Sequence, residues 1–187
     1  WNYINSFTEF NSYKHQVLSS FKNSIFQMPI NLETINSFFK KNFKPEQAKE
    51  FLFNKTKKYQ KNSYENFEDK AISQIGSKLY KAFIKEYTMK QWGKNPKELP
   101  SSIFNRLPLR FNYNENYFNS STWQGIPKDG YTKVFENLIS KKLIELKFDN
   151  YKLSNNKYDV KYLTLYTGPL DKLFDYSFGS LEWRSLK

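Results

Sequence analysis

The sequence contains no cysteine and only one histidine, His15. Without cysteine there is no disulfide framework, no thiolate metal site and no redox thiol, which fits a reducing cytoplasm without requiring it. A single histidine excludes metal sites built on histidine pairs and weakens any serine–histidine mechanism. The adjacent carboxylates of Glu68 and Asp69 diverge on a helix, so they suit its first turn better than an acid–base pair.

Glycine is also scarce, with six residues that are not clustered. The chain as given has neither a G-x-G-x-x-G motif nor a Walker loop, so it lacks a dinucleotide-phosphate fingerprint of its own. No apolar run approaches the roughly 18 residues that a membrane span needs, and no signal-peptide segment opens the chain. We therefore expect a cytoplasmic protein without a membrane span.

Positive charge and aromatic side chains are abundant. The 187 residues carry a formal net charge of +12, and 19% of them are aromatic. This charge suggests nucleic acid or another polyanion as a partner. However, the lysines are dispersed along the chain, and the abundance of Lys, Asn, Phe and Tyr is also typical of an AT-rich genome. A basic, aromatic-rich module that binds nucleic acid or a protein partner is therefore one alternative for this chain.

Hydrophobic spacing predicts a helical first half. Apolar residues recur at helical intervals from Phe7 to Phe21. Asn31 is a candidate N-cap, and Pro45 suits the first turn of a further helix. The strongest helical pattern runs over 66–88, where Gly76 marks either close helix packing or a break between two helices.

The second half reads as mixed α and β structure. Residues 111–118 suggest a strand or extended chain, and a helix carrying Val134 follows the turn at 125–132. Residues 143–148 and 161–168 are strand-like, which together with the helix suggests a fragment of α/β architecture. Composition and spacing alone support only a basic, aromatic-rich α+β or α/β protein.

Five longer motifs are more specific. They occur in this order and at plausible separations: FEDKAISQIGSKLYKAFIKEYTMKQWG, RLPLRFNYNENYF, QGIPKDGYT, YTGPLDKLFDYSFG and LEWRSL. Together they resemble UDP-galactopyranose mutase, and the resemblance covers nearly the whole chain. It implies a flavoenzyme that interconverts UDP-galactopyranose and UDP-galactofuranose for galactofuranose-containing cell-surface glycans. The resemblance also implies the first step, in which N5 of reduced FAD attacks the anomeric carbon and UDP departs.

The resemblance also implies an organisation. We expect the end of a first FAD-domain segment at 1–15 and a helical substrate-binding domain at 16–114, with a mobile loop near 98–110. Parts of a β-sheet domain and of a Rossmann-like FAD domain should follow at 115–187. FAD would be held largely by segments outside this chain, so we expect the chain alone to bind flavin poorly and not to turn over. The family commonly forms dimers.

Several residues match the family's uridine pocket. Phe83 and Tyr87 are four residues apart on a helix, so they share a face and could flank a uracil ring. Thr88 matches a polar contact beside the pocket, and Trp92 a position near the sugar. Structural roles explain two of these residues as well, because Phe83 could be a core residue and Trp92 could serve packing alone.

Other residues match the family's diphosphate contacts. Arg106 lies where the family carries an arginine on a mobile loop, and its planar fork suits phosphate. Tyr117 matches a tyrosine whose hydroxyl meets the diphosphate. Arg110 is a weaker candidate that fits a solvated or structural arginine better.

The remaining candidates are weaker. His15 falls where the family lines the active-site cleft, although a surface or capping histidine explains it equally well. Thr167, Gly168 and Pro169 close a Rossmann-type strand where the backbone would approach the flavin. Arg184 matches an arginine near the flavin and substrate. No metal site is expected.

Overall fold

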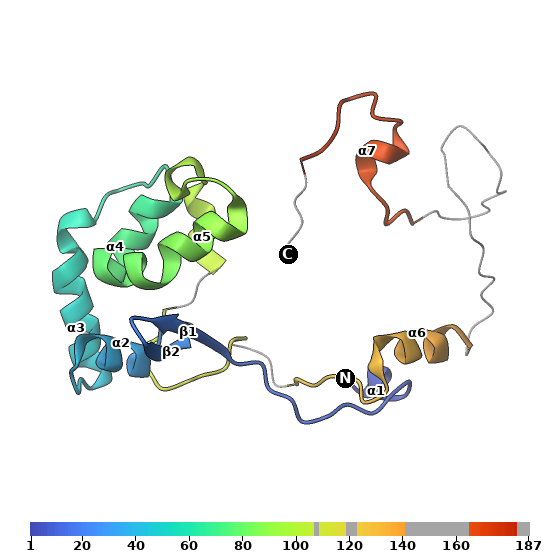
Figure 1. Ribbon diagram of the computed structural model, residues 1–187, viewed down its shortest axis with the longest axis horizontal. Helices are drawn as coiled ribbons and strands as arrows, with labels where there is room; N and C mark the ends of the chain where they lie inside the picture. Colours follow the sequence, from blue (N-terminus) through green and yellow to red (C-terminus); the bar gives the residue numbers. More distant parts are fainter. Residues whose placement is uncertain (107–108, 119–122, 141–164, 183–187) are drawn as a thin grey trace. The chain divides into compact units, whose positions relative to one another are not determined.

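The computed structural model describes residues 1–106, 109–118, 123–140 and 165–182. It divides into two compact units, Trp1–Phe135 and Glu136–Lys187. Secondary structure in the described part is mostly helical with one small antiparallel sheet, which makes the fold a mixed α+β structure (Figure 1). The predicted strands at 143–148 and most of 161–168, on which the sheet and Rossmann-like parts depend, lie outside the described residues.

The first unit begins with a short helix, α1 (Asn2–Asn5), and then a β-hairpin of β1 (Val17–Phe21) and β2 (Ser24–Met28). The helix predicted between Phe7 and Phe21 is therefore wrong. The helical reading placed Leu18 on the buried face, whereas burial alternates along β1 and Leu18 is exposed. The two-residue turn explains the hairpin, because Lys22 and Asn23 both have positive φ, as a tight hairpin loop requires.

Two helices follow as their capping residues predict. In α2 (Leu32–Phe39), the side chain of Asn31 accepts a hydrogen bond from the N–H of Thr34 at 2.9 Å. In α3 (Pro45–Thr56), Pro45 occupies the first turn, where its missing N–H costs no helical hydrogen bond. A 3-10 turn, η1 (Lys57–Tyr59), extends α3.

The strongest predicted helix is interrupted. It consists of α4 (Phe67–Leu79), a π-helical turn η2 (Tyr80–Ile84) and α5 (Lys85–Trp92). Gly76 adopts φ 77° and ψ 156°, a conformation that is nearly exclusive to glycine, so the predicted break lies there. Beyond α5 come two 3-10 segments, η3 (Pro96–Glu98) and η4 (Ser101–Arg106).

The hydrophobic core of the first unit lies between the hairpin, α2, α3 and the α4–η2–α5 segment. Leu32, Ile35 and Leu79 are fully buried in it, and Phe67 and Phe104 pack edge to face at 5.5 Å. The core also holds Tyr80, whose hydroxyl donates to the Glu68 carboxylate at 2.7 Å. Lys97 approaches the same carboxylate at 3.8 Å.

Burial, and then the hydrogen bond to Glu68, raise the pKa of the Tyr80 hydroxyl above its ordinary value. Below the ordinary tyrosine pKa of about 10 the hydroxyl keeps its proton whether the chain is folded or unfolded. At higher pH only the unfolded chain loses it, so the free energy of unfolding should fall by up to about 1.4 kcal/mol per pH unit from this group. Tyr80→Phe removes the group. We therefore expect the parent's advantage over Tyr80→Phe in urea unfolding to shrink between pH 9 and pH 11, and a constant difference would contradict this assignment.

Two further helices are described. The predicted helix after the 125–132 turn is α6 (Gly130–Ser140), in which Val134 is buried. In the second unit a single turn, α7 (Leu170–Leu173), is followed by a bend in which the N–H of Leu181 donates to the Asp171 carboxylate at 3.0 Å. Among the described residues, no helix has both the length and the apolar character to cross a membrane.

Candidate functional site

The predicted uridine pocket begins at the π-helical turn. Phe83 is 6% exposed and packs against Phe21, Phe26 and Phe38, with ring centroids 5.0–5.8 Å apart. Tyr87, four residues later, is 59% exposed on α5. The two rings therefore occupy different environments, Phe83 in the core and Tyr87 at the surface.

The π-helical turn explains why the two environments differ. In η2 the N–H of Lys85 donates to the carbonyl of Tyr80, five residues back, instead of four. This adds a residue to the turn and rotates the following side chains relative to an ideal α-helix. Spacing of four residues therefore does not guarantee a common face here, and the role of both rings in ligand binding stays a prediction.

Thr88 and Trp92 continue along α5. Thr88 is 3% exposed, whereas Trp92 is partly buried and packs against the core cluster. Helix α5 ends at Gly93, which has φ 61° and whose N–H donates to the carbonyl of Met89 at 2.8 Å. Trp92 thus has a structural role, and a contact with ligand remains a prediction.

A second group of candidates meets in an aromatic cluster. The rings of His15 and Tyr117 lie edge to face with centroids 5.2 Å apart, although about a hundred residues separate them in the sequence. Phe118 lies 5.2 Å from Tyr117 and 5.8 Å from His15. The hydroxyl of Tyr13 lies 3.3 Å from Nδ1 of His15. We call these four residues the His15 cluster; it brings together two of the predicted site residues.

Hydrogen bonds join the segment that carries His15 to residues 124–126. The N–H of Asn11 donates to Ile126 O at 3.0 Å, and the N–H of His15 donates to Oε1 of Gln124 at 3.0 Å. A Cβ on Gly125 would lie 2.6 Å from the carbonyl oxygen of Asn11, so glycine permits this close approach. Sequence reasoning missed Tyr13, Phe118 and Gln124, since nothing in their spacing pairs them with His15.

Arg110 contacts the main chain of Tyr117 and is 6% exposed. Its Nη1 donates to the main-chain carbonyl of Asn114 at 3.1 Å and to that of Asn116, and Nη2 donates to the carbonyl of Tyr117 at 3.4 Å. Burial lowers the pKa of the guanidinium from its usual value. Of the two alternatives, a solvated or a structural arginine, Arg110 is therefore the structural one. Residues 111–118 form an irregular loop around it, not a strand.

The structure says less about the three remaining candidates, which are Arg106, Arg184 and the segment 167–169. Arg106 ends η4, and its side chain lies outside the described residues, as does all of Arg184. Thr167, Gly168 and Pro169 are exposed in the second unit. A Cβ on Gly168 would lie 2.5 Å from the hydroxyl oxygen of Tyr166, a side-chain end that can move aside. The contact of Thr167, Gly168 and Pro169 with the flavin stays a prediction.

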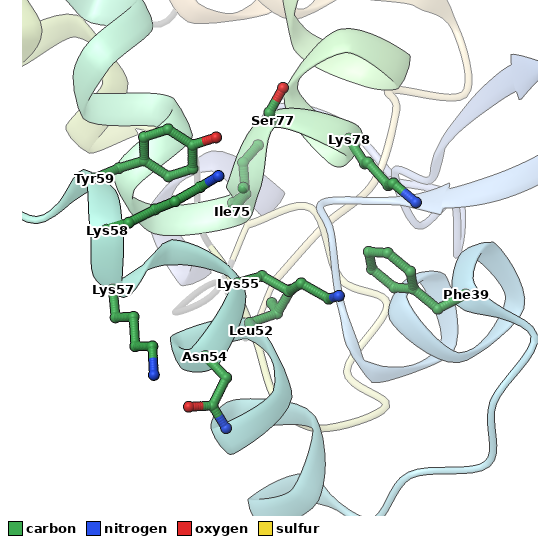
Figure 2. A pocket seen from close by; sticks show the side chains of 11 residues that line it. Phe39, Leu52, Asn54, Lys55, Lys57, Lys58, Tyr59, Ile75, Ser77 and Lys78 are labelled. Atoms are coloured by element: carbon green, nitrogen blue, oxygen red, sulfur yellow. The ribbon is translucent and has the colours of Figure 1, made fainter.

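Two cavities are described in the first unit. One, of about 460 Å³, lies between α3, η1 and the kink at Gly76, and is lined by Lys55, Lys57, Lys58 and Lys78 among others (Figure 2). The second, of about 440 Å³, is lined by residues that include Trp1, Trp123 and Gln124. No predicted site residue lines either cavity, but Gln124 connects the second to the backbone of His15. Among the described residues no cluster of potential metal ligands is found.

Comparison with known proteins identifies relatives. The family model for UDP-galactopyranose mutase matches residues 82–187, more than half of the chain. A protein from Klebsiella pneumoniae described as a probable UDP-galactopyranose mutase is 40% identical over 188 residues, which cover 100% of this chain and 48% of that protein. A dTDP-fucopyranose mutase from Escherichia coli is 37% identical over 193 residues, covering 100% of this chain and 50% of that protein. A UDP-galactopyranose mutase from Mycoplasma genitalium is 27% identical over 212 residues, which cover 99% of this chain and 48% of that protein.

These matches define a class of nucleotide-sugar mutases. The chain belongs to the UDP-galactopyranose mutase family, as its motifs predict. It spans about half the length of the curated relatives that it matches.

Proposed function

We propose that this chain is the nucleotide-binding part of an enzyme that interconverts UDP-galactopyranose and UDP-galactofuranose. The observation that carries the proposal is the His15 cluster, in which the predicted site residues His15 and Tyr117 meet from distant parts of the sequence. Family membership supplies the reaction class. The product would feed galactofuranose-containing cell-surface glycans.

In this proposal each residue type does a separate task. The exposed ring of Tyr87 is available to stack on the uracil ring. Tyr117, 37% exposed in the His15 cluster, would donate its hydroxyl to the diphosphate. Arg106 would bind the diphosphate through its planar fork and stabilise the negative charge on UDP as the bond to the anomeric carbon breaks.

FAD would provide, when bound in its reduced form, the nucleophile that replaces UDP at the anomeric carbon. The chain spans about half the length of its relatives, and the proposal assigns FAD mainly to the rest of the protein. This chain would contribute the residues that bind UDP while UDP is detached from the sugar.

A dTDP sugar is a second candidate substrate. The Escherichia coli relative, a dTDP-fucopyranose mutase, is almost as similar to this chain as the Klebsiella pneumoniae relative. UDP and dTDP share a pyrimidine and a diphosphate but differ at the ribose 2′-hydroxyl and the base methyl group. The stacking and phosphate contacts proposed here suit both.

Titration of tryptophan fluorescence tests the proposal, since Trp92 lies on the same short helix as Tyr87. We expect UDP to change the fluorescence in a saturable way and a single-stranded oligonucleotide of equal charge to leave it unchanged at moderate salt. Tighter binding of dTDP than of UDP would instead select the dTDP sugar. Binding of the oligonucleotide but of neither nucleotide would favour the nucleic-acid alternative and overturn the proposal.

A further inference from the structure

All the hydrogen bonds that the Arg110 guanidinium makes in the described structure end on one loop. Its three acceptors are the main-chain carbonyls of Asn114, Asn116 and Tyr117, and no carboxylate pairs with it among the described residues. At the other end, the N–H of Arg110 donates to the carbonyl of Ile30 at 3.0 Å, beside the start of α2. The residue therefore ties the loop to the core of the first unit.

The loop is shaped to bend around this guanidinium. Oδ1 of Asn112 accepts from the N–H of Asn114 at 3.1 Å, and Oδ1 of Asn114 accepts from the N–H of Asn116 at 3.0 Å. These are two successive Asx turns, which hold the backbone in a tight curve without strand pairing. The carbonyls of 114, 116 and 117 face the Arg110 guanidinium. The rings of Tyr117 and Phe118, at the end of the loop, contact His15.

Core packing alone does not explain an arginine at this position. A buried cation is costly to desolvate, and an apolar side chain of similar length would often pack as well or better. Here Nε also has no hydrogen-bond partner, which adds to the cost. What an apolar side chain could not do is donate to several carbonyls at once, and the planar fork of arginine suits that task.

We propose that Arg110 is a positioning residue that fixes the 111–118 loop so that the Tyr117 ring stays against His15. The contact of Tyr117 with the diphosphate rests on the proposed function; the positioning of the ring does not. Arg110 would then affect nucleotide binding without touching the nucleotide.

The only histidine in the sequence provides a direct readout. In an NMR spectrum of the 187-residue chain, the ring protons of His15 give one set of histidine signals, shifted by the neighbouring Tyr117 and Phe118 rings. We expect Arg110→Met, which keeps the aliphatic length, to move these signals toward their positions in Tyr117→Ala. Amide exchange in 111–118 should rise about tenfold or more while α4 stays protected. Lys97→Met, a change at an exposed cation whose described pair is Glu68 at 3.8 Å, should leave the His15 signals in place.

Unchanged His15 signals in a folded Arg110→Met chain would overturn the proposal. If α4 loses its amide protection in Arg110→Met, the variant is too unstable to test the proposal. Asn114→Ala then tests it, because this change removes an Asx turn without emptying a buried site. It should move the His15 signals in the same direction, and unmoved signals would count against Arg110 as well.

UDP binding separates this proposal from the proposed function. If both hold, Arg110→Met and Tyr117→Ala each weaken UDP binding, and the double variant is little weaker than either, because both act through one ring. If the His15 signals move but neither variant changes UDP affinity, the positioning role stands and the assignment of Tyr117 to the diphosphate fails.

Discussion

Phe83→Ala should lower the free energy of unfolding by about 3–5 kcal/mol, the usual cost of emptying a buried aromatic site. Phe83 contacts three other phenylalanines at 5.0–5.8 Å and is 6% exposed, so its neighbours surround it on several sides. Total stabilities of about 5–15 kcal/mol are normal for a domain, and this loss is a large part of them. Urea unfolding followed by circular dichroism measures it.

Tyr87→Ala is the matched aromatic control. Because Tyr87 is 59% exposed on α5, we expect its removal to change the free energy of unfolding by less than about 0.5 kcal/mol. If Tyr87 stacks on uracil, the same variant should weaken UDP binding by about 0.5–1.5 kcal/mol, or roughly two- to tenfold.

Phe83→Leu then separates the two roles of Phe83. It retains most of the apolar volume, so stability should fall by less than about 1.5 kcal/mol. A stable Phe83→Leu chain with UDP binding close to that of the parent assigns Phe83 to the core. If Phe83→Leu instead loses UDP binding with little loss of stability, Phe83 belongs to the uridine pocket.

Local signals made part of this fold predictable. Capping by Asn31 and helix initiation by Pro45 depend on atoms within one turn, so the residue types alone identify them. Gly76 is similar, because a backbone conformation with φ 77° and ψ 156° is nearly restricted to glycine. Each of these features needs no knowledge of distant segments.

The hairpin was missed because its apolar residues satisfy two periods at once. Val17 and Phe21 fit one helical face by their spacing of four, and the same spacing also fits one face of a strand. Leu18 separates the readings, because the helical stripe buries it and the strand exposes it. The signal that favours the strand is the turn, where Asn23 tolerates positive φ.

The candidate site was predictable as a set of motifs but not as an arrangement. The motifs single out Tyr87 and Tyr117, yet the spacing of the apolar residues does not reveal the π-helical turn that precedes Tyr87. Arg110 is a similar case. Its acceptors are carbonyls, which every residue carries, so no residue type reveals the contact from sequence.

The largest functional effect is expected for Arg106→Ala in the complete enzyme, where kcat should fall by about 10²-fold or more while the bound flavin remains unchanged. In the proposed reaction, negative charge would develop on UDP as its bond to the anomeric carbon breaks. Removing one electrostatic contact to such a charge typically costs about 10²–10³ in rate. Steady-state kinetics together with the flavin absorbance of the purified enzyme measure both quantities.

The division of the effect between kcat and KM tests what Arg106 does. An interaction made mainly in the transition state lowers kcat with little change in KM, whereas one made equally with bound substrate raises KM alone. Arg106→Lys keeps the charge but loses the fork, so its kcat should lie between those of the parent and Arg106→Ala. Lys97→Ala is the control, because the Lys97 ammonium is exposed and lies 3.8 Å from Glu68, a weak contact whose loss should leave turnover close to the parent value. Parental turnover in Arg106→Ala would remove Arg106 from the site and leave the diphosphate to other cations.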